Sequence, residues 1–456
     1  MGHPILDAMR ASRALVYATA AALPAFLLPV HLGPLSTSAL EIAVVATLVV
    51  YAVEVYATGV RPRWPGAFTG PMLLVVAAMP IVVAVSPDRR AAMDVLRTTC
   101  VEPALFFGVT CSALSGPREM GRFVRALLLG GGCVALMIIG AFAHAMATGQ
   151  ADVLGQPPVA WYPRAAQAGL LLTPLIALAG ALALLTPSRA WHADRVWTGL
   201  FLLVAVPAAV LTLSQAAWLA LGAVVFALAL AVTHGRRRRL VGVAVPMMAA
   251  LGMAALLAAP ARGSVAEEIR TGGGPVAGVD SRAQLWHDAG VLLRAQPLLG
   301  SGVGALRGRD ATGEAADVAG RDDPSNLVLA WWLRFGVPGL AGMLWFVARA
   351  GRWLARLRSA DPSLRPFVVG AGTALLAVFV AGLLDTTYFS PDLAVLTLGA
   401  AALIATAARL QRVRLRALVR VPLGAADIEP AELPMPADIP RSTGRFPAAP
   451  PPVPGG

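Results

Sequence analysis

The sequence predicts an all-α membrane protein, a polytopic bundle of about twelve transmembrane helices with a partly helical extracytoplasmic loop between spans nine and ten. Three observations predict this fold. Hydrophobic residues make up 57% of the 456 residues and charged residues only 14%, whereas a soluble domain carries about 25% charged residues. Apolar runs long enough to cross a bilayer follow one another along the chain. Arginines gather in every second connection between these runs. An ordinary soluble enzyme, a disordered protein and a fibrous protein are therefore excluded.

The predicted spans follow from the rule that a crossing helix needs about 20 mostly apolar residues. They lie near 14–31, 39–58, 66–86, 99–115, 126–146, 165–186, 197–213, 216–233, 241–259, 326–348, 366–384 and 392–408. The first run follows Arg10 and Arg13, as the apolar part of a signal peptide would. Because no small-residue cleavage site follows it, we interpret it as an uncleaved first helix.

The distribution of arginine predicts the orientation. All 37 Lys and Arg residues are arginine, and the net charge is +12. With the N-terminus in the cytoplasm, the inner loops hold clusters such as Arg236 to Arg239, and an even number of spans returns the C-terminus to the cytoplasm. The short outer loops then hold only four arginines: Arg89, Arg90, Arg97 and Arg164. This pattern predicts a multi-pass protein of the inner (plasma) membrane and no nucleic-acid partner.

Two segments lie outside the spans. Residues 260–325 form a long loop that faces outward, and long ordered loops are usually functional. Within it, Ser281 and Gln284 predict the start of a helix that ends before Pro297, and the glycines of 300–304 predict a turn. Residues 421–456 are Pro-rich without an apolar period, so we expect a disordered cytoplasmic tail after a bundle of residues 1–420.

Ionisable residues within the spans and the outer loop are the candidate functional groups. Arg282 and Trp286 share one helix face, and Arg282 either binds a phosphate or pyrophosphate or forms a salt bridge with a loop carboxylate. Arg334 lies in the tenth span, where it would pair with a carboxylate such as Glu102 or Asp385. The three cysteines form no metal-spaced cluster with histidine, so we expect no metal and no cofactor.

Four stretches carry a resemblance to a known family. They are L-T-L-S-Q-A-A-W-L-A-L (211–221), S-R-A-Q-L-W (281–286), Q-P-L-L-G-S-G-V-G (296–304) and P-S-N-L-V-L-A-W-W-L-R-F-G-V-P-G-L (324–340). Together with the order of many spans, a long outer loop and further spans, they resemble the O-antigen ligase and polymerase superfamily over roughly residues 165–405.

The resemblance implies a glycosyl transfer outside the cytoplasm. Members take a glycan from undecaprenyl pyrophosphate and join it to a sugar hydroxyl on a second lipid-linked or glycan acceptor, with no nucleotide and no metal. The implied role is in surface polysaccharide biosynthesis, such as O-antigen for lipopolysaccharide, or exopolysaccharide. The implied partners are membrane lipid, the undecaprenyl-pyrophosphate-linked donor and the acceptor.

The resemblance also suggests the site residues. The family's Arg after the first motif's serine is Gln215 here, and its His before Asn326 is Ser325, whereas Arg282 is retained. The expected catalytic residues are Arg282, Ser325, Asn326 and Asp323, of which Asp323 is either a replacement base or a helix cap. The expected pyrophosphate- or glycan-binding residues are Arg89, Arg90, Arg164, Gln215, Trp286 and Arg334.

Two other functions remain open from the sequence. A non-catalytic member of the same fold would bind lipid-linked glycan or partner enzymes without transfer. A transporter of lipid-linked glycan is the third reading, although no pair of Gly/Pro-broken spans in inverted repeats supports it.

Overall fold

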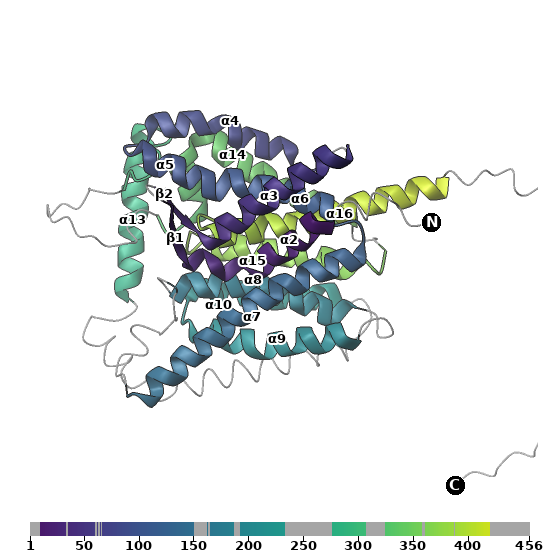
Figure 1. Ribbon diagram of the computed structural model, residues 1–456. Helices are drawn as coiled ribbons and strands as arrows, with labels where there is room; N and C mark the ends of the chain where they lie inside the picture. Colours follow the sequence, from purple (N-terminus) through teal and green to yellow (C-terminus); the bar gives the residue numbers. More distant parts are fainter. Residues whose placement is uncertain are drawn as a thin grey trace, which may run out of the picture. The chain divides into compact units, whose positions relative to one another are not determined.

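The computed structural model describes residues 10–32, 35–59, 62, 64, 66–149, 162, 165–186, 192–232, 276–306, 324–357, 361–386 and 388–419. These residues are almost entirely helical (Figure 1). The chain divides into two units, Met1–Gln411 and Arg412–Gly456.

The helices follow one another with short connections where the structure describes them. They are α2 (Arg10–Ala21), the 3-10 helix η1 (Leu23–Leu27), α3 (Ala39–Thr58), α4 (Thr69–Val85), α5 (Arg89–Leu96), the π-helix η2 (Arg97–Val101), α6 (Glu102–Ala113), α7 (Pro117–Ala147), α8 (Ala165–Leu185), α9 (His192–Leu211), α10 (Gln215–Val232), α13 (Val276–Ala295), α14 (Leu327–Arg356), α15 (Arg365–Ala381) and α16 (Pro391–Val419). The strands β1 (Pro29–Leu32) and β2 (Leu35–Ser38) form an antiparallel hairpin.

Length and composition support the membrane interpretation. Five described helices are long and apolar enough to cross a bilayer: α3, α7, α8, α14 and α16. Four shorter apolar helices accompany them: α4, α9, α10 and α15. The all-helical membrane fold is confirmed at this level. The number of twelve spans remains a prediction, and the ninth predicted span, 241–259, lies outside the described residues.

Burial separates the central helices from the peripheral ones. In α8 and in α16, 89% of the residues in the most apolar 18-residue stretch are buried, and α8 packs against α15, α9 and α10. In the corresponding stretch of α3, only 22% of the residues are buried. Its exposed residues Ile42, Val45, Val49 and Val53 recur at helical spacing on one face. A helix that is apolar all round belongs in the interior, and an exposed apolar face suits lipid.

The start of the chain differs from the prediction of one helix over 14–31. Helix α2 ends at Ala21, and η1 and the hairpin follow. Pro24 at the start of η1 and Pro29 at the start of β1 explain the break, since proline cannot continue a helical hydrogen-bond ladder. The carboxylate of Glu54, on α3, accepts hydrogen bonds from the backbone N–H groups of Ala11 (3.0 Å) and Ser12 (3.3 Å) and so caps α2.

The outer-loop helix is present but begins earlier than predicted. Helix α13 starts at Val276 rather than at Ser281, and it ends at Ala295, just before Gln296 and Pro297 as predicted. It packs against α14 and runs across one end of the neighbouring helices (Figure 1). A capping motif in the sequence can therefore lie inside a helix when an upstream segment extends it.

Candidate functional site

Helix α14 is broken at Gly336, and the loop after α13 fills the break. Gly336 has φ +63° and ψ −163°. Val337 N–H, which in a continuous helix would donate to Leu333 O, donates instead to Leu298 O (2.9 Å). Leu333 O accepts two hydrogen bonds from the loop, from Ser301 N (2.7 Å) and Gly302 N (3.1 Å). Residues 298–303, hereafter the spliced turn, therefore replace part of the helical ladder.

The start of α14 is fixed to the end of α15. Asn326 caps α14, because its Oδ1 accepts hydrogen bonds from Val328 N (3.0 Å) and Leu329 N (3.1 Å). Its Nδ2 donates to Leu383 O (3.0 Å), and Leu327 N donates to Gly382 O (2.6 Å). This capping fixes Asn326, and Ser325 just before it, at the point where α14 and α15 meet.

An aromatic cluster surrounds the first half of α14. It consists of Trp331, Phe335, Tyr388 and Phe389, whose ring centroids lie 4.8 to 6.2 Å apart in the contacting pairs. The Arg334 guanidinium lies over the Phe389 ring, 4.2 Å from its centroid. Arg334 is only 7% exposed. The Arg334 guanidinium thus lies against an aromatic ring and is largely shielded from solvent.

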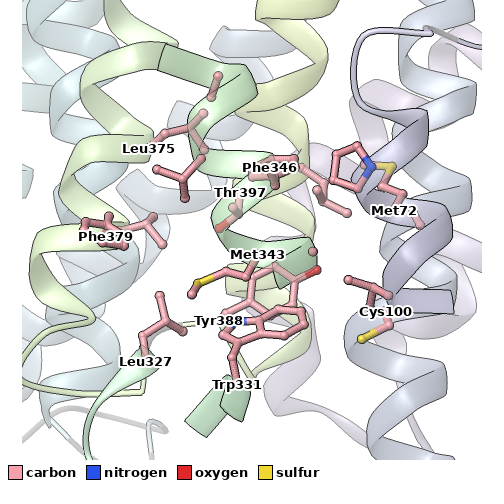
Figure 2. Close-up of a pocket in the computed structure, with 18 of the residues that line it drawn as sticks. Met72, Cys100, Leu327, Trp331, Met343, Phe346, Leu375, Phe379, Tyr388 and Thr397 are labelled. Carbon is pink, nitrogen blue, oxygen red and sulfur yellow. The ribbon is translucent and has the colours of Figure 1, made fainter. Parts of the chain in front are cut away.

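An apolar cavity of about 270 Å³ adjoins this cluster (Figure 2). Its walls come from α4, α14 and α15, with Cys100, Tyr388 and Thr397 as its few polar side chains. Leu327 and Trp331 line it at one end of α14 and Leu354 at the other. At a rise of 1.5 Å per residue these positions are separated by about 40 Å of helix, comparable to the thickness of a bilayer. A short apolar chain segment fits such a cavity.

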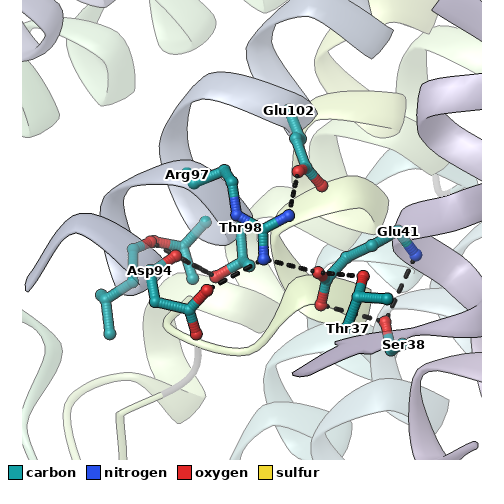
Figure 3. A network of polar contacts seen from close by, with 9 residues as sticks. Thr37, Ser38, Glu41, Asp94, Arg97, Thr98 and Glu102 are labelled. Carbon is teal, nitrogen blue, oxygen red and sulfur yellow. Dashed lines mark hydrogen bonds and ion pairs between the residues drawn. The ribbon is translucent and has the colours of Figure 1, made fainter. Parts of the chain in front are cut away.

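A second polar group lies where α3 meets α5 and α6 (Figure 3). Arg97, in the π-helix, forms ion pairs with Glu41 (2.9 Å), Glu102 (2.8 Å) and Asp94 (2.9 Å). Thr37 Oγ1 and Ser38 Oγ donate hydrogen bonds to the Glu41 carboxylate (2.8 and 3.0 Å). The burial of Glu41 and Glu102 within apolar runs is thus explained by a shared partner. This ion-pair network ties α3 to the helix that carries Cys100.

The comparison with known families concerns the segment that includes the first half of α14. The model of the family described as O-antigen ligase matches residues 199–344. Residues 199–344 belong to the O-antigen ligase family. None of the curated proteins compared with the chain matches it. The O-antigen ligase segment contains the spliced turn, Asn326 and Arg334, and it ends within α14.

Within the O-antigen ligase segment, the structure separates the predicted residues. Asn326 and Arg334 lie at the start of α14 and in its first half, and neither lines the cavity, although their neighbours Leu327 and Trp331 do. Ser325, with φ +47°, precedes the cap. Gln215 is exposed at the start of α10, where Ser214 Oγ accepts a hydrogen bond from Ala217 N (3.2 Å). Trp286 is 39% exposed on α13, and neither it nor Gln215 lines the cavity.

The remaining predicted residues do not enter the described site. Arg89 and Arg90 are exposed in the first turn of α5, whose N-cap is Asp88, and neither lines the cavity. The backbone of Arg282 lies in α13, but its side chain is outside the described part of the chain. Arg164 and Asp323 are outside the described residues altogether.

The sequence did not predict the aromatic cluster or the splicing of the turn into α14 as parts of the candidate site. Tyr388 and Phe389 carry no spacing signal that links them to Trp331 or to the rest of α14. The glycines at 300 and 302 were interpreted as a turn, which the positive φ values of +73° and +78° confirm. The available signal was Gly336 followed by Pro338, which predicts a helix break.

Proposed function

We propose that this protein transfers a glycan from undecaprenyl pyrophosphate to an acceptor sugar hydroxyl at the outer face of the inner membrane, as a ligase or polymerase of surface polysaccharide. The O-antigen ligase domain supports a membrane glycan ligase or polymerase type of function. The observation that carries the proposal is an apolar cavity of about 270 Å³ lined by Trp331, with the buried Arg334 about one helical turn further along α14. An apolar site for a lipid chain, together with a cation for an anionic group, suits a ligand that carries both.

The donor binds in two parts. The first isoprene units of its polyprenyl chain occupy the cavity, whose lining by Met79, Met343, Phe379 and similar side chains offers only dispersion contacts and exclusion of water. Its pyrophosphate lies at Arg334, because a guanidinium fork binds two phosphate oxygens at once. The low exposure of Arg334 strengthens this interaction, since little water screens it.

The reaction is a substitution at the anomeric carbon. The acceptor hydroxyl oxygen forms a bond to that carbon, the bond from the carbon to the pyrophosphate oxygen breaks, and undecaprenyl pyrophosphate leaves with both electrons. Arg334 and Arg282 stabilise the charge that develops on the leaving group. The hydroxyl proton goes to a base, for which Asp323 is proposed, three residues before the cap at Asn326. His287, beside Asp288 on α13, is the second choice of base.

A non-catalytic relative that only binds lipid-linked glycan is the alternative. The replacements that favour it are Gln215 and Ser325, where the family resemblance leads us to expect Arg and His. A serine hydroxyl has no useful basicity near neutral pH, so Ser325 cannot itself accept the proton. Transfer and binding therefore have to be measured separately.

The test uses the full chain in lipid nanodiscs with a labelled undecaprenyl-pyrophosphate-linked glycan as the probe. Met343→Trp places a larger side chain in the cavity and should lower donor binding, measured by native mass spectrometry, at least about tenfold. The control is Leu203→Trp on the exposed face of α9, which should bind as wild type does.

The outcomes separate the two functions. Donor binding with formation of a longer or ligated glycan supports transfer. Donor binding that Met343→Trp weakens, but with no product in any acceptor mixture, supports the non-catalytic alternative. Equal donor binding by wild type, Met343→Trp and Leu203→Trp would contradict the cavity as the donor site.

A further inference from the structure

We propose that Ser86, acting through the spliced turn, is a positioning residue for Arg334. The inference rests on the proposed function, in which Arg334 binds the donor pyrophosphate. Ser86 lies at the C-cap of α4, more than 200 residues before Arg334 in the sequence. It is outside the matched O-antigen ligase segment.

The first step is the loss of the helical ladder next to Arg334. The carbonyl of Arg334 would ordinarily accept a hydrogen bond from residue 338, which is proline and has no N–H. The preceding carbonyl, of Leu333, has lost Val337 N–H to Leu298 O. The two ladder bonds that would connect the halves of α14 at this point are therefore absent.

The second step is that the spliced turn takes over this connection. Ser301 N and Gly302 N donate to Leu333 O, and Trp332 Nε1 donates to Pro297 O (2.8 Å). A Cβ at Gly300 would meet the backbone of Trp332, Leu333 and Gly336, which shows how closely the turn approaches the helix. The orientation of the segment that carries Arg334 consequently depends on where this turn lies.

The third step is that Ser86 fixes the turn from the opposite side. Its Oγ accepts a hydrogen bond from Val303 N (2.9 Å) and donates one to Val82 O (2.6 Å). Ser86 is only 6% exposed. A Cβ at Gly302 would collide with Ser86, so no side chain separates the two. Through Ser86, the position of α4, which forms one wall of the cavity, therefore fixes the turn that binds Leu333 O, the carbonyl next to Arg334 in the chain.

The experiment compares Ser86→Ala with a matched serine. Ser112 is also buried and also donates back to a helix carbonyl, of Gly108 (3.1 Å), but it lies outside the spliced turn. Each variant, in nanodiscs, is assayed for binding of undecaprenyl pyrophosphate and for hydrogen exchange of the amides at 301–303. Arg334→Gln and the Ser86→Ala/Arg334→Gln double variant complete the cycle.

We expect Ser86→Ala to speed exchange of the turn amides and to weaken binding of undecaprenyl pyrophosphate about tenfold, as loss of one buried hydrogen bond would. Ser112→Ala should do neither. Because Ser86 acts through Arg334, the double variant should bind no more weakly than Arg334→Gln alone. If Ser86→Ala is too unstable to purify, Gly302→Ala should give the same pattern by displacing the turn from Ser86.

Each contrary result has a separate meaning. Unchanged amide exchange in Ser86→Ala would overturn the role of Ser86 in fixing the turn. Additive losses in the double variant would overturn positioning through Arg334. Unchanged binding in Arg334→Gln would show that the proposed pyrophosphate site is wrong, and the positioning role would fall with it.

Discussion

Arg334 is the residue on which the proposed chemistry depends most. If it stabilises the leaving pyrophosphate, Arg334→Gln should lower the transfer rate by about 10²–10³, the usual effect of losing one transition-state donor. Arg334→Lys should restore only part of the rate, since an ammonium cannot form the two-point contact of a guanidinium. The measurement is single-turnover transfer from labelled donor. The control is Arg294→Gln, an exposed arginine on α13 that should transfer at the wild-type rate.

Asn326 has a capping role that can be measured apart from catalysis. Asn326→Ala removes both hydrogen bonds to the first turn of α14 and the one to Leu383 O. The free energy of unfolding should fall by about 1–2 kcal/mol, as for other N-caps. Asn326→Asp should keep the cap and lose only the bond to Leu383 O, so its thermal unfolding should lie between Asn326→Ala and wild type. A melting temperature of Asn326→Ala equal to that of wild type would contradict this role.

At single positions, the sequence indicated which residues are functional candidates, but it did not indicate which residues they contact. An arginine is energetically costly within an apolar run, so the sequence predicts a functional role for Arg334 that stays a prediction, and the structure shows that the residue is buried. Its stacking on Phe389 was not predictable, because that contact joins α14 to the connection before α16. Glu102 was expected as a possible partner of Arg334, whereas the structure pairs it with Arg97. Sequence spacing cannot rank such long-range pairs.

Among the elements, the ion-pair network around Arg97 joins three helices and makes a testable contribution to stability. Arg97→Met would leave Glu41 and Glu102, each 7% exposed, without their cation. We expect a loss of about 1–3 kcal/mol in the free energy of unfolding, less than for a fully buried pair because Arg97 is 40% exposed.

The test of the network includes a rescue. Adding Glu41→Gln and Glu102→Gln to Arg97→Met removes the uncompensated carboxylates and should recover most of the melting temperature. Arg90→Met, an exposed arginine on α5, serves as the control and should unfold as wild type does. An Arg97→Met variant as stable as wild type would mean that the network contributes nothing.

Long apolar elements were the most predictable from the sequence. The runs at 39–58 and 326–348 correspond to α3 and to most of α14, because apolar length alone specifies a spanning helix. The hairpin at 29–38 was missed, since an apolar run interrupted by prolines does not distinguish a strand from a helix end. The start of α13 was also missed. Its first turn contains Gly278, a residue that weakens a helix prediction.

At the scale of the whole molecule, burial and lipid exposure form one pattern. The interior helices α8 and α16 are apolar on all sides, and the exposed faces of α3 and α9 are also apolar. A water-soluble protein places polar residues on its exposed faces, whereas here the solvent of those faces is lipid. Composition alone predicted this property, because 14% charged residues cannot cover the surface of a chain this long.

The orientation of the molecule is the prediction on which the outer position of the site depends. Arginines cluster in every second connection, and such loops remain in the cytoplasm. In a background in which Cys100, Cys111 and Cys133 are replaced by serine, Gly273→Cys in the long loop should react with a membrane-impermeant thiol reagent in spheroplasts. Gly235→Cys, next to the run Arg236 to Arg239, should react only after the membrane is permeabilised. The reverse labelling pattern would place the start of α14 and Arg334 on the cytoplasmic side, where an outward-facing lipid-linked glycan cannot reach them.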